Sequence, residues 1–333
     1  CTQNQWQLQM VTPISVSQGG GSSGDTVSTV KSCTGPTVKA NPSNVQSVIN
    51  QHDNATILLE PGQYLTGPGL LKVEKKDCIE LRCNQPAIVN GNQPNKQNGC
   101  VTNNQILGNR IKNLIIENMV IASDNSDLGG RGTTNWDYGI RLYNVNAVRI
   151  ENNAFAGDNN HDISTKDTVT YAEVFNNLFV RCTRHCVEVG QNANIPSNPS
   201  TSGTMNIVGN TFVEPQINAI TQRYNQKLII RDNEFINTKG RAIQNWALWK
   251  KYYGENPIIP EPPLYTEIVG NTFTGSNKIE LQGRGARDDS VLFKDNSGSF
   301  SCNRVKMPDR EASAHANIQT KDAPKLATGS DSC

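Results

Sequence analysis

The stretch Tyr138–Phe155, YGIRLYNVNAVRIENNAF, is followed by three stretches of the same form. They are HDISTKDTVTYAEVFNNLF at 161–179, HCVEVGQN…GTMNIVGNTF at 185–212 and NAITQRYNQKLIIRDNEF at 218–235. Each contains a short apolar strand, a bend, a second strand and then Asn-x-Phe. Weaker copies begin at Arg241 and Lys278. The central part of the chain is therefore a repeat, and the repeat decides the fold.

The spacing of the repeat predicts a solenoid. The asparagines of Asn-x-Phe stand at 153, 177, 210, 233 and 271, so the steps are 24, 33, 23 and 38 residues. A base period of about two dozen residues with insertions at fixed points is typical of solenoids whose insertions form loops on one side. Because the copies contain several short strands and no helical periodicity, each predicts one coil of an all-β, parallel β-helix.

Three regions are expected along this single domain. Residues 1–35 form an extension, with an alternating edge strand at Trp6–Val11 and a linker rich in Gly and Ser. Residues 36–298 form the β-helix, and a short helix after Ser43 or Asn44, with Val45, Val48 and Ile49 on one face, caps its first coil. Residues 299–333 lack the repeat and are expected to form a tail that folds back on the coil and is held by Cys302 and Cys333.

Composition excludes several function classes. The 333 residues have a net charge of +1, which gives neither the basic surface of a nucleic-acid-binding protein nor an acidic tail. No apolar run reaches the roughly 20 residues that a membrane-spanning helix needs. We therefore expect neither a nucleic-acid partner nor a transmembrane segment.

The nine cysteines contain no metal-type CxxC pair, which favours disulfides and hence an extracellular or cell-surface location. Nine is odd, so one cysteine is left over. Cys1 is a candidate for lipid attachment, because processed bacterial lipoproteins begin with cysteine; the other interpretation is that Cys1 forms a disulfide like the rest.

The Asn-x-Phe coils, the helical cap and the segment ATILLEPGQY at 55–64 resemble the right-handed, single-stranded parallel β-helices of the pectate lyase-like superfamily. That superfamily includes polysaccharide lyases for pectin, alginate and chondroitin. The resemblance covers roughly residues 36–298. It implies a right-handed coil and an acidic polysaccharide as partner.

Aligned copies place their side chains in columns, because equivalent residues of successive coils stack about 4.8 Å apart and alternate between the two faces. The predicted inward ladder is Ile140, Ile163, Val187, Ile220, Ile243 and Ile279. Two outward, exposed columns are predicted between these rows: Arg141, Ser164, Glu188, Thr221, Gln244 and Glu280, and beside it Tyr143, Lys166, Gly190, Arg223, Trp246 and Gln282. Gly190 would leave a gap for a sugar ring between Lys166 and Arg223, whose stems would start about 10 Å apart.

Three insertions point to the same face. They are DNSDLGGRGTTNWD at 124–137, QNANIPSNPSTSG at 191–203 and ALWKKYYGENPIIPEPPLY at 247–265. Loops that wall one face form a groove. Aromatic and basic side chains at its edge suit stacking on sugar rings and attraction of carboxylates. The predicted substrate-binding residues are Arg141, Tyr143, His161, Trp246, Trp249, Lys250 and Tyr252.

Uronic-acid polymers are cleaved by elimination when a base takes the proton beside the carboxylate and a cation neutralises that carboxylate. We predict Lys166, Arg223, Glu188, Arg184 and His185 as catalytic residues. HDISTKDTVTYAEVFNNLF resembles the segment of alginate and chondroitin lyases in which calcium-binding acids precede a catalytic lysine, and Lys166 falls on that lysine. This chain departs from the pattern because Asn159 and His161 stand where that family has its acids, and no arginine aligns with the second catalytic residue. DISTK at 162–166 followed by VEVG at 187–190 also resembles the pectate lyase pattern, and Arg223 stands one position away from the catalytic arginine of that pattern.

Metal ligands are the least specific part of the pattern. Asp158 and Asp162, with Glu188, could bind Ca²⁺, but their spacing is not that of a dedicated loop. His161, Cys182, His185 and Cys186 could bind zinc, although C-x-x-x-C outside the cytosol is more often disulfide-bonded.

Two functions follow from the sequence. The first is a secreted or surface polysaccharide lyase that cleaves a uronic-acid polymer by β-elimination; hydrolysis by Asp288–Asp289 is a weaker enzymatic alternative. The second is a non-catalytic β-helix, such as an adhesin, spike or filament subunit, that binds glycans or self-associates through its N-terminal strand.

Overall fold

The structure is a computed structural model that describes residues 30–64, 70–91, 93–102, 105–122, 138–156, 161–191, 203–223, 227–246, 265–284 and 291–307. Side chains are not described for Asp167, Gln191, Arg223, Asn245, Trp246, 282–284 and 303–307. The alternating strand at Trp6–Val11, residues 124–137, 192–202 and 247–264 of the three insertions, and most of the expected tail lie outside the described residues.

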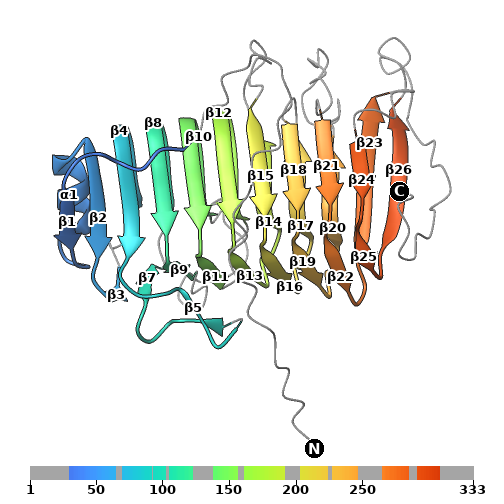
Figure 1. Ribbon diagram of the computed structural model, residues 1–333, viewed down its shortest axis with the longest axis horizontal. Coiled ribbons are helices and arrows are strands. Elements are labelled where there is room, and N and C mark those ends of the chain that lie inside the picture. The colour runs from blue at the N-terminus through green and yellow to red at the C-terminus, as the bar shows by residue number, and fades with distance from the viewer. Residues whose placement is uncertain are drawn as a thin grey trace, which may run out of the picture.

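Two long parallel sheets wind along one axis (Figure 1). The larger sheet contains β1 (Thr37–Ala40), β2 (Asn54–Leu59), β4 (Leu71–Cys83), β8 (Ile106–Glu117), β10 (Tyr138–Glu151), β12 (His161–Phe175), β14 (His185–Gln191), β15 (Thr204–Val208), β17 (Asn218–Arg223), β18 (Lys227–Arg231), β20 (Arg241–Trp246), β21 (Tyr265–Val269), β23 (Lys278–Arg284), β24 (Val291–Lys294) and β26 (Ser301–Met307). In Figure 1 these strands stand side by side from blue to red.

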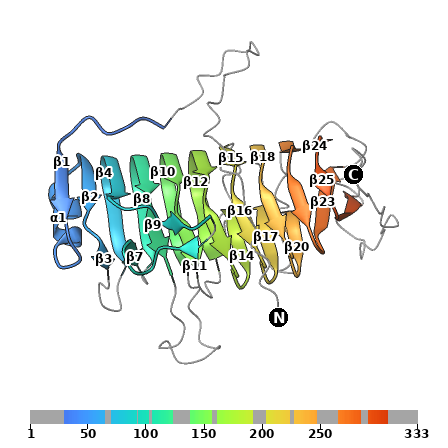
Figure 2. The same cartoon turned by 60° about the horizontal axis from the view of Figure 1, so that its bottom comes forward.

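The second sheet contains shorter strands, some of which come forward in Figure 2. They are β3 (Gly62–Gln63), β7 (Cys100–Thr102), β9 (Met119–Ile121), β11 (Ala154–Ala156), β13 (Leu178–Val180), β16 (Thr211–Val213), β19 (Glu234–Ile236), β22 (Thr272–Thr274) and β25 (Ser297–Gly298). A separate antiparallel pair is formed by β5 (Ile88–Val89) and β6 (Gln93–Pro94). The fold expected from the sequence, a right-handed parallel β-helix, is confirmed.

The predicted inward ladder is also confirmed. Ile140 pairs with Ile163, and the pairing continues through Val187, Ile220 and Ile243 to Ile279. Each of these side chains is at most 1% exposed. Apolar side chains of every coil therefore fill the axis of the β-helix, and each coil buries its core face only because a neighbour stacks on it.

The Asn-x-Phe signature forms two stacked ladders at one corner of the coil. The ladder asparagines bind one another through side-chain amides, and from the second one on each oxygen accepts from the backbone N–H of the preceding asparagine at 2.9–3.0 Å. The ladder consists of Asn153, Asn177, Asn210, Asn233, Asn271 and Asn296, and the oxygen of Asn153 accepts from Met119 N–H. Their amide nitrogens also donate to backbone carbonyls such as Ile150 O. Because each coil turns sharply here, these buried asparagines satisfy backbone groups that no sheet could pair.

The phenylalanines stack beside the asparagines. Phe155, Phe179, Phe212 and Phe235 lie ring on ring with centroids 4.7–4.9 Å apart and planes within 6°. Each is 0% exposed. The spacing matches that of the strands, so the stack continues as long as the repeat does.

A helix of about two turns covers the first coil, as predicted. The helix α1 (Val45–Gln51) begins after Asn44 and buries Val45 and Ile49 against the core. Figure 1 shows it beside β1 at the end of the stack. It prevents the first coil from exposing its apolar interior.

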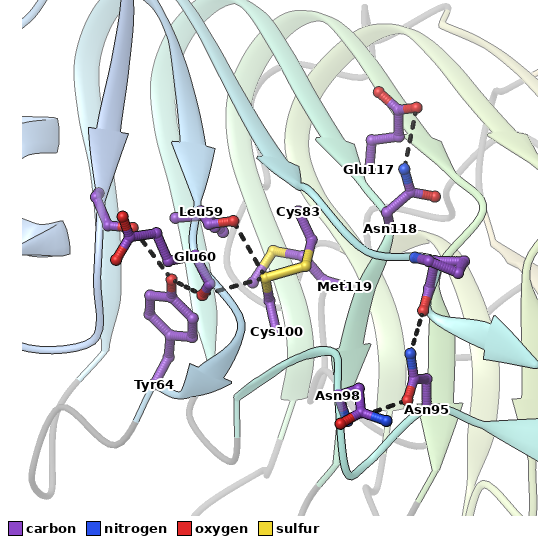
Figure 3. The surroundings of a disulfide bond; sticks show 12 residues. Leu59, Glu60, Tyr64, Cys83, Asn95, Asn98, Cys100, Glu117, Asn118 and Met119 are labelled. Carbon is purple, nitrogen blue, oxygen red and sulfur yellow. Dashed lines mark hydrogen bonds between the residues drawn. A yellow bond between two sulfur atoms is a disulfide. The ribbon is translucent and has the colours of Figure 1, made fainter.

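Disulfides join Cys33 to Cys78, Cys83 to Cys100 and Cys182 to Cys186. Figure 3 shows the second of these beside Tyr64, whose hydroxyl donates to Glu60 O at 2.6 Å. Cys302 is disulfide-bonded as well. The expectation that the cysteines form disulfides is confirmed for these residues.

The coil extends past the boundary expected at residue 298. Ser301–Met307 forms β26, which pairs in parallel with β23. The repeat signature Asn-x-Phe is absent there, so the sequence pattern could not indicate this strand. The tail expected from residue 299 therefore starts as one more strand of the β-helix.

Candidate functional site

Two rows of polar side chains meet on β10, β12, β14, β17, β20 and β23. The histidine row consists of Tyr138, His161, His185, Asn218 and Arg241, which are paired in register. The glutamate row consists of Arg141, Ser164, Glu188, Thr221, Gln244 and Glu280, also in register. The second row is the first of the two columns predicted from the sequence, and its order is confirmed.

The exposure predicted for that column is wrong. Ser164, Glu188 and Thr221 are 0% exposed and Gln244 is 7% exposed. The backbone pairings between these strands skip the residue that follows each member of the histidine row, for example Asp162 and Cys186. Side chains three residues apart then contact each other, so the two rows cover each other and form a buried polar cluster.

The centre of the cluster is a carboxylate. Glu188 Oε2 lies 3.2 Å from His161 Nδ1 and accepts a hydrogen bond from Ser164 Oγ at 3.1 Å. His161 and Glu188 are both 0% exposed. A buried carboxylate is tolerated only when such partners compensate for its lost hydration.

His185 is held by the next coil. Its Nδ1 lies 3.0 Å from Thr221 Oγ1 and 3.2 Å from Asn218 Nδ2. Asn218 Nδ2 in turn donates to Gln244 Oε1 at 2.7 Å. These contacts fix the orientation of the imidazole.

A lysine and a tyrosine meet at one side of the cluster. Lys166 Nζ donates to Tyr138 Oη at 2.8 Å, and the guanidinium of Arg141 lies 4.6 Å from the centre of the Tyr138 ring. Burial raises the pKa of Tyr138 and the charge of Glu188 adds to this, whereas Arg141 and Arg184 act in the opposite direction. The phenol is therefore protonated at neutral pH and can serve as a proton donor.

Partly exposed residues border this pair. Arg141, Tyr143 and Arg184 are of intermediate exposure, whereas Lys166 is 8% and Tyr138 3% exposed. Arg141 also lies over the ring of Tyr143 at 4.8 Å. Two cations and an aromatic ring thus surround a buried proton donor and amine.

The second predicted column is interrupted at Gly190. Lys166 pairs with Gln191 rather than with Gly190, and the register shifts after Ser164. Gly190 has φ 77°, a backbone conformation that favours glycine, and its N–H donates to Thr165 Oγ1 at 2.8 Å. The predicted gap for a sugar ring at Gly190 is therefore wrong, because this glycine makes a bulge instead.

Several predicted residues can be placed only by their backbone or not at all. Arg223 pairs with Trp246 between β17 and β20. Asp158, Trp249, Lys250 and Tyr252 lie outside the described residues. Tyr138, by contrast, belongs to the cluster but was not predicted. Its place at the start of a repeat, one coil before His161, is the signal that could have indicated it.

The predicted metal ligands fall into two groups. Asp162 lies with Cys182 and Cys186, whereas Glu188 lies with the two histidines. The zinc set that included Cys182 and Cys186 is wrong, because these cysteines form a disulfide and present no thiolate. Around Glu188 the donors are two imidazoles and one carboxylate. This set does not fit Ca²⁺, which takes six to eight oxygen ligands.

Comparison with known proteins supports the fold. No protein-family model matches the chain, and no curated protein sequence matches it. Among solved structures, an alginate lyase of the PL6 family has a TM-score of 0.50 and 12% identity over 84% of this chain and 38% of its own. A pectate lyase from Bacillus sp. N165 in complex with trigalacturonate has a TM-score of 0.45 and 12% identity over 90% and 91%. A pectate lyase variant from Xanthomonas campestris has a TM-score of 0.41 and 14% identity over 82% and 81%.

At 12% identity the similarity to the alginate lyase concerns the fold alone. This chain spans 38% of the length of that enzyme. The resemblance to pectate lyase-like β-helices that the coils predicted is therefore confirmed at the level of the fold.

Proposed function

We propose that the chain is a polysaccharide lyase that cleaves an acidic, uronic-acid-containing polymer by β-elimination. The observation that carries the proposal is the 2.8 Å hydrogen bond from Lys166 Nζ to Tyr138 Oη, beside Arg141 and within reach of the charge of Arg184. β-Elimination needs a base, an acid and a cation that neutralises the substrate carboxylate. The described residues offer all three within one cluster.

The reaction uses the amine and the phenol in turn. Lys166, as the neutral amine, takes the proton from C5, beside the carboxylate of the uronate. The electrons of that C–H bond form the C4=C5 double bond, and the bond from C4 to the glycosidic oxygen breaks. Tyr138 gives its proton to the leaving oxygen. The Lys166 ammonium then returns a proton to the Tyr138 phenolate along their hydrogen bond, which restores both groups.

The arginines stabilise the charge that develops. Arg141 and Arg184 both lower the pKa of Tyr138, so each stabilises negative charge at this place. A guanidinium also binds a carboxylate through two parallel hydrogen bonds. Arg223 is a further candidate for this role, and Tyr143 for stacking on a sugar ring. His185 and Glu188 hold the cluster together on its buried side.

An extracellular or cell-surface location belongs to the same proposal. Three disulfides among the described residues support an oxidising compartment. No helix in the described ranges is long and apolar enough to cross a membrane.

The test is the ultraviolet absorbance of the unsaturated product. Alginate, polygalacturonate and glycosaminoglycans are offered separately to the purified chain. We expect product from at least one uronate polymer, and a loss of rate of about 10²–10⁴-fold in Lys166→Ala and in Tyr138→Phe. Absence of product from every polymer would refute the proposal.

A matched lysine–tyrosine pair serves as control. Lys227 Nζ lies 5.5 Å from the centre of the Tyr265 ring on neighbouring coils of the same sheet, away from the cluster. Lys227→Ala and Tyr265→Phe should keep the wild-type rate. Retained binding of a polymer without product would favour the non-catalytic, glycan-binding alternative.

A further inference from the structure

We propose that His161, His185 and Glu188 form a binding site for a divalent transition metal of the zinc class. Their ligand atoms, one from each residue, all lie within 4.8 Å of one another. The side chains are 0%, 4% and 0% exposed. This site lies beside the proposed elimination residues, since the ring of His161 stacks on that of Tyr138 with centroids 4.9 Å apart, but the elimination itself uses Lys166 and Tyr138 and needs no metal.

The repeat itself brings the three residues together. His161 and His185 are paired in register on β12 and β14, and their ring centroids are 5.0 Å apart. Glu188 follows His185 by three residues, and its carboxylate lies within 4.8 Å of the ligand atoms of both histidines. Two imidazoles on adjacent coils and a carboxylate one row away are thus a consequence of coil stacking, and the folded chain holds them before any metal arrives.

The distances within the cluster suit a tetrahedral ion. Zinc bonds to nitrogen and oxygen are about 2.0–2.2 Å long, which puts two ligands of a tetrahedron about 3.3–3.6 Å apart. His161 Nδ1 and Glu188 Oε2 are 3.2 Å apart. A small rotation of either side chain would open this separation to that of two zinc ligands.

The donor atoms select the metal. Two imidazole nitrogens and one carboxylate oxygen are ligands that zinc and its neighbours prefer, whereas calcium and magnesium require oxygen. The sulfurs of Cys182 and Cys186 are joined in a disulfide and cannot compete.

Neighbouring residues form hydrogen bonds to the proposed metal-binding side chains and hold them in orientation. Thr221 Oγ1 lies 3.0 Å from His185 Nδ1, so a hydrogen bond between them fixes the orientation of the imidazole within the cluster. Ser164 Oγ donates to Glu188 Oε2 at 3.1 Å. Such partners fix the tautomer of a metal-binding histidine and the direction of a carboxylate.

The experiment measures metal binding directly, on tag-free protein treated with a chelator. Zn²⁺, Co²⁺ and Ca²⁺ chlorides are titrated separately, with calorimetry and elemental analysis as readouts. We expect one Zn²⁺ per chain, visible absorption bands of tetrahedral Co²⁺, no saturable Ca²⁺ binding at the cluster, and X-ray absorption with nitrogen and oxygen but no sulfur neighbours.

Variants assign the binding to the cluster. His161→Ala, His185→Ala and Glu188→Gln should each weaken Zn²⁺ binding at least tenfold, whereas His52→Gln, which changes the histidine just after α1, should leave it unchanged. The wild-type Co²⁺ spectrum decides the matter even if a variant fails to fold. Less than one equivalent of bound Zn²⁺ without a tetrahedral Co²⁺ spectrum, or binding unaffected in folded variants, would overturn the site. A metal bound without any lyase activity would leave this proposal standing and refute the other.

Discussion

Stacking of successive coils builds both the asparagine and phenylalanine ladders and the polar cluster. The ladders repeat one residue type, whereas the cluster combines different residue types. At the corner of the coil the same residue returns in every turn, from Asn153 to Asn296 and from Phe155 to Phe235. In the histidine row each turn brings a different residue: Tyr138, His161, His185, Asn218 and Arg241. Identical neighbours stabilise the coil, whereas different neighbours combine chemical groups that one coil cannot supply.

The comparison predicts where a substitution affects stability and where it affects function. In a ladder each side chain completes the contacts of two like neighbours, so removal leaves a defect in the scaffold. In the cluster the partners differ, so a substitution there also removes a group that the proposed catalysis or metal binding uses. Ladder substitutions should therefore lower the free energy of unfolding, and cluster substitutions should act on catalysis or metal binding.

The largest effect on stability is expected for Phe212→Ala. Phe212 is 0% exposed and stacks on Phe179 at 4.7 Å and on Phe235 at 4.9 Å. Loss of a buried phenylalanine and the resulting cavity should lower the free energy of unfolding by about 3–5 kcal/mol. Denaturant titration followed by circular dichroism measures this. Phe300→Ala, at the end of the stack where the rings are tilted by 49°, should cost less; equal losses would mean that the stack adds nothing to burial.

A smaller loss is expected for Asn210→Ala in the neighbouring ladder. Asn210 Oδ1 accepts from the backbone N–H and the side chain of Asn177, at 2.9 and 3.0 Å. Without it these buried donors lose their partner, which should cost about 2–3 kcal/mol. Asn206→Ala is the control, because Asn206 makes one partly buried hydrogen bond, to Tyr171. A similar loss in both would contradict the special role of the ladder.

Repetition also explains which parts could be predicted from sequence. The coil, the inward ladder and the order of the glutamate row follow from the period of the repeat, because equivalent positions must stack. The burial of Glu188 could not be predicted, because alternation places it outward. It is buried since His161 and Ser164 of the neighbouring coil contact it, and no residue type in the pattern signals these contacts.

The sequence pattern missed the bulge at Gly190 and the presence of Tyr138 in the polar cluster for a related reason. A column drawn by counting residues assumes an unbroken register, and one glycine with φ 77° shifts it. The contact between Lys166 and Tyr138 links residues 28 apart. Such contacts depend on side-chain direction, which a repeat does not specify.

The smallest effect on the free energy of unfolding is expected where neighbouring coils place glutamates of like charge side by side. Glu117 and Glu151 are paired on β8 and β10. Burial raises the pKa of Glu151, Arg149 lowers it, and the like charges of Glu117 and Glu173 raise it further. A carboxyl whose pKa is higher in the folded chain favours folding only while protonated, so its contribution is lost as pH rises from the unfolded pKa through the folded one.

Glu151→Gln should therefore raise the free energy of unfolding at neutral pH, by about 0.5 kcal/mol, because it removes a like charge from this row. The gain should disappear as pH falls below the ordinary pKa of a glutamate, where both chains carry a neutral group. Denaturant titrations of wild type and variant across this range measure the difference. Glu74→Gln, at an exposed position of β4, should show no such dependence. The contradicting outcome is that Glu151→Gln lowers the free energy of unfolding at neutral pH. Stacked glutamates would then stabilise the coil as the stacked asparagines and phenylalanines do, and the identity of the repeated residue would not matter.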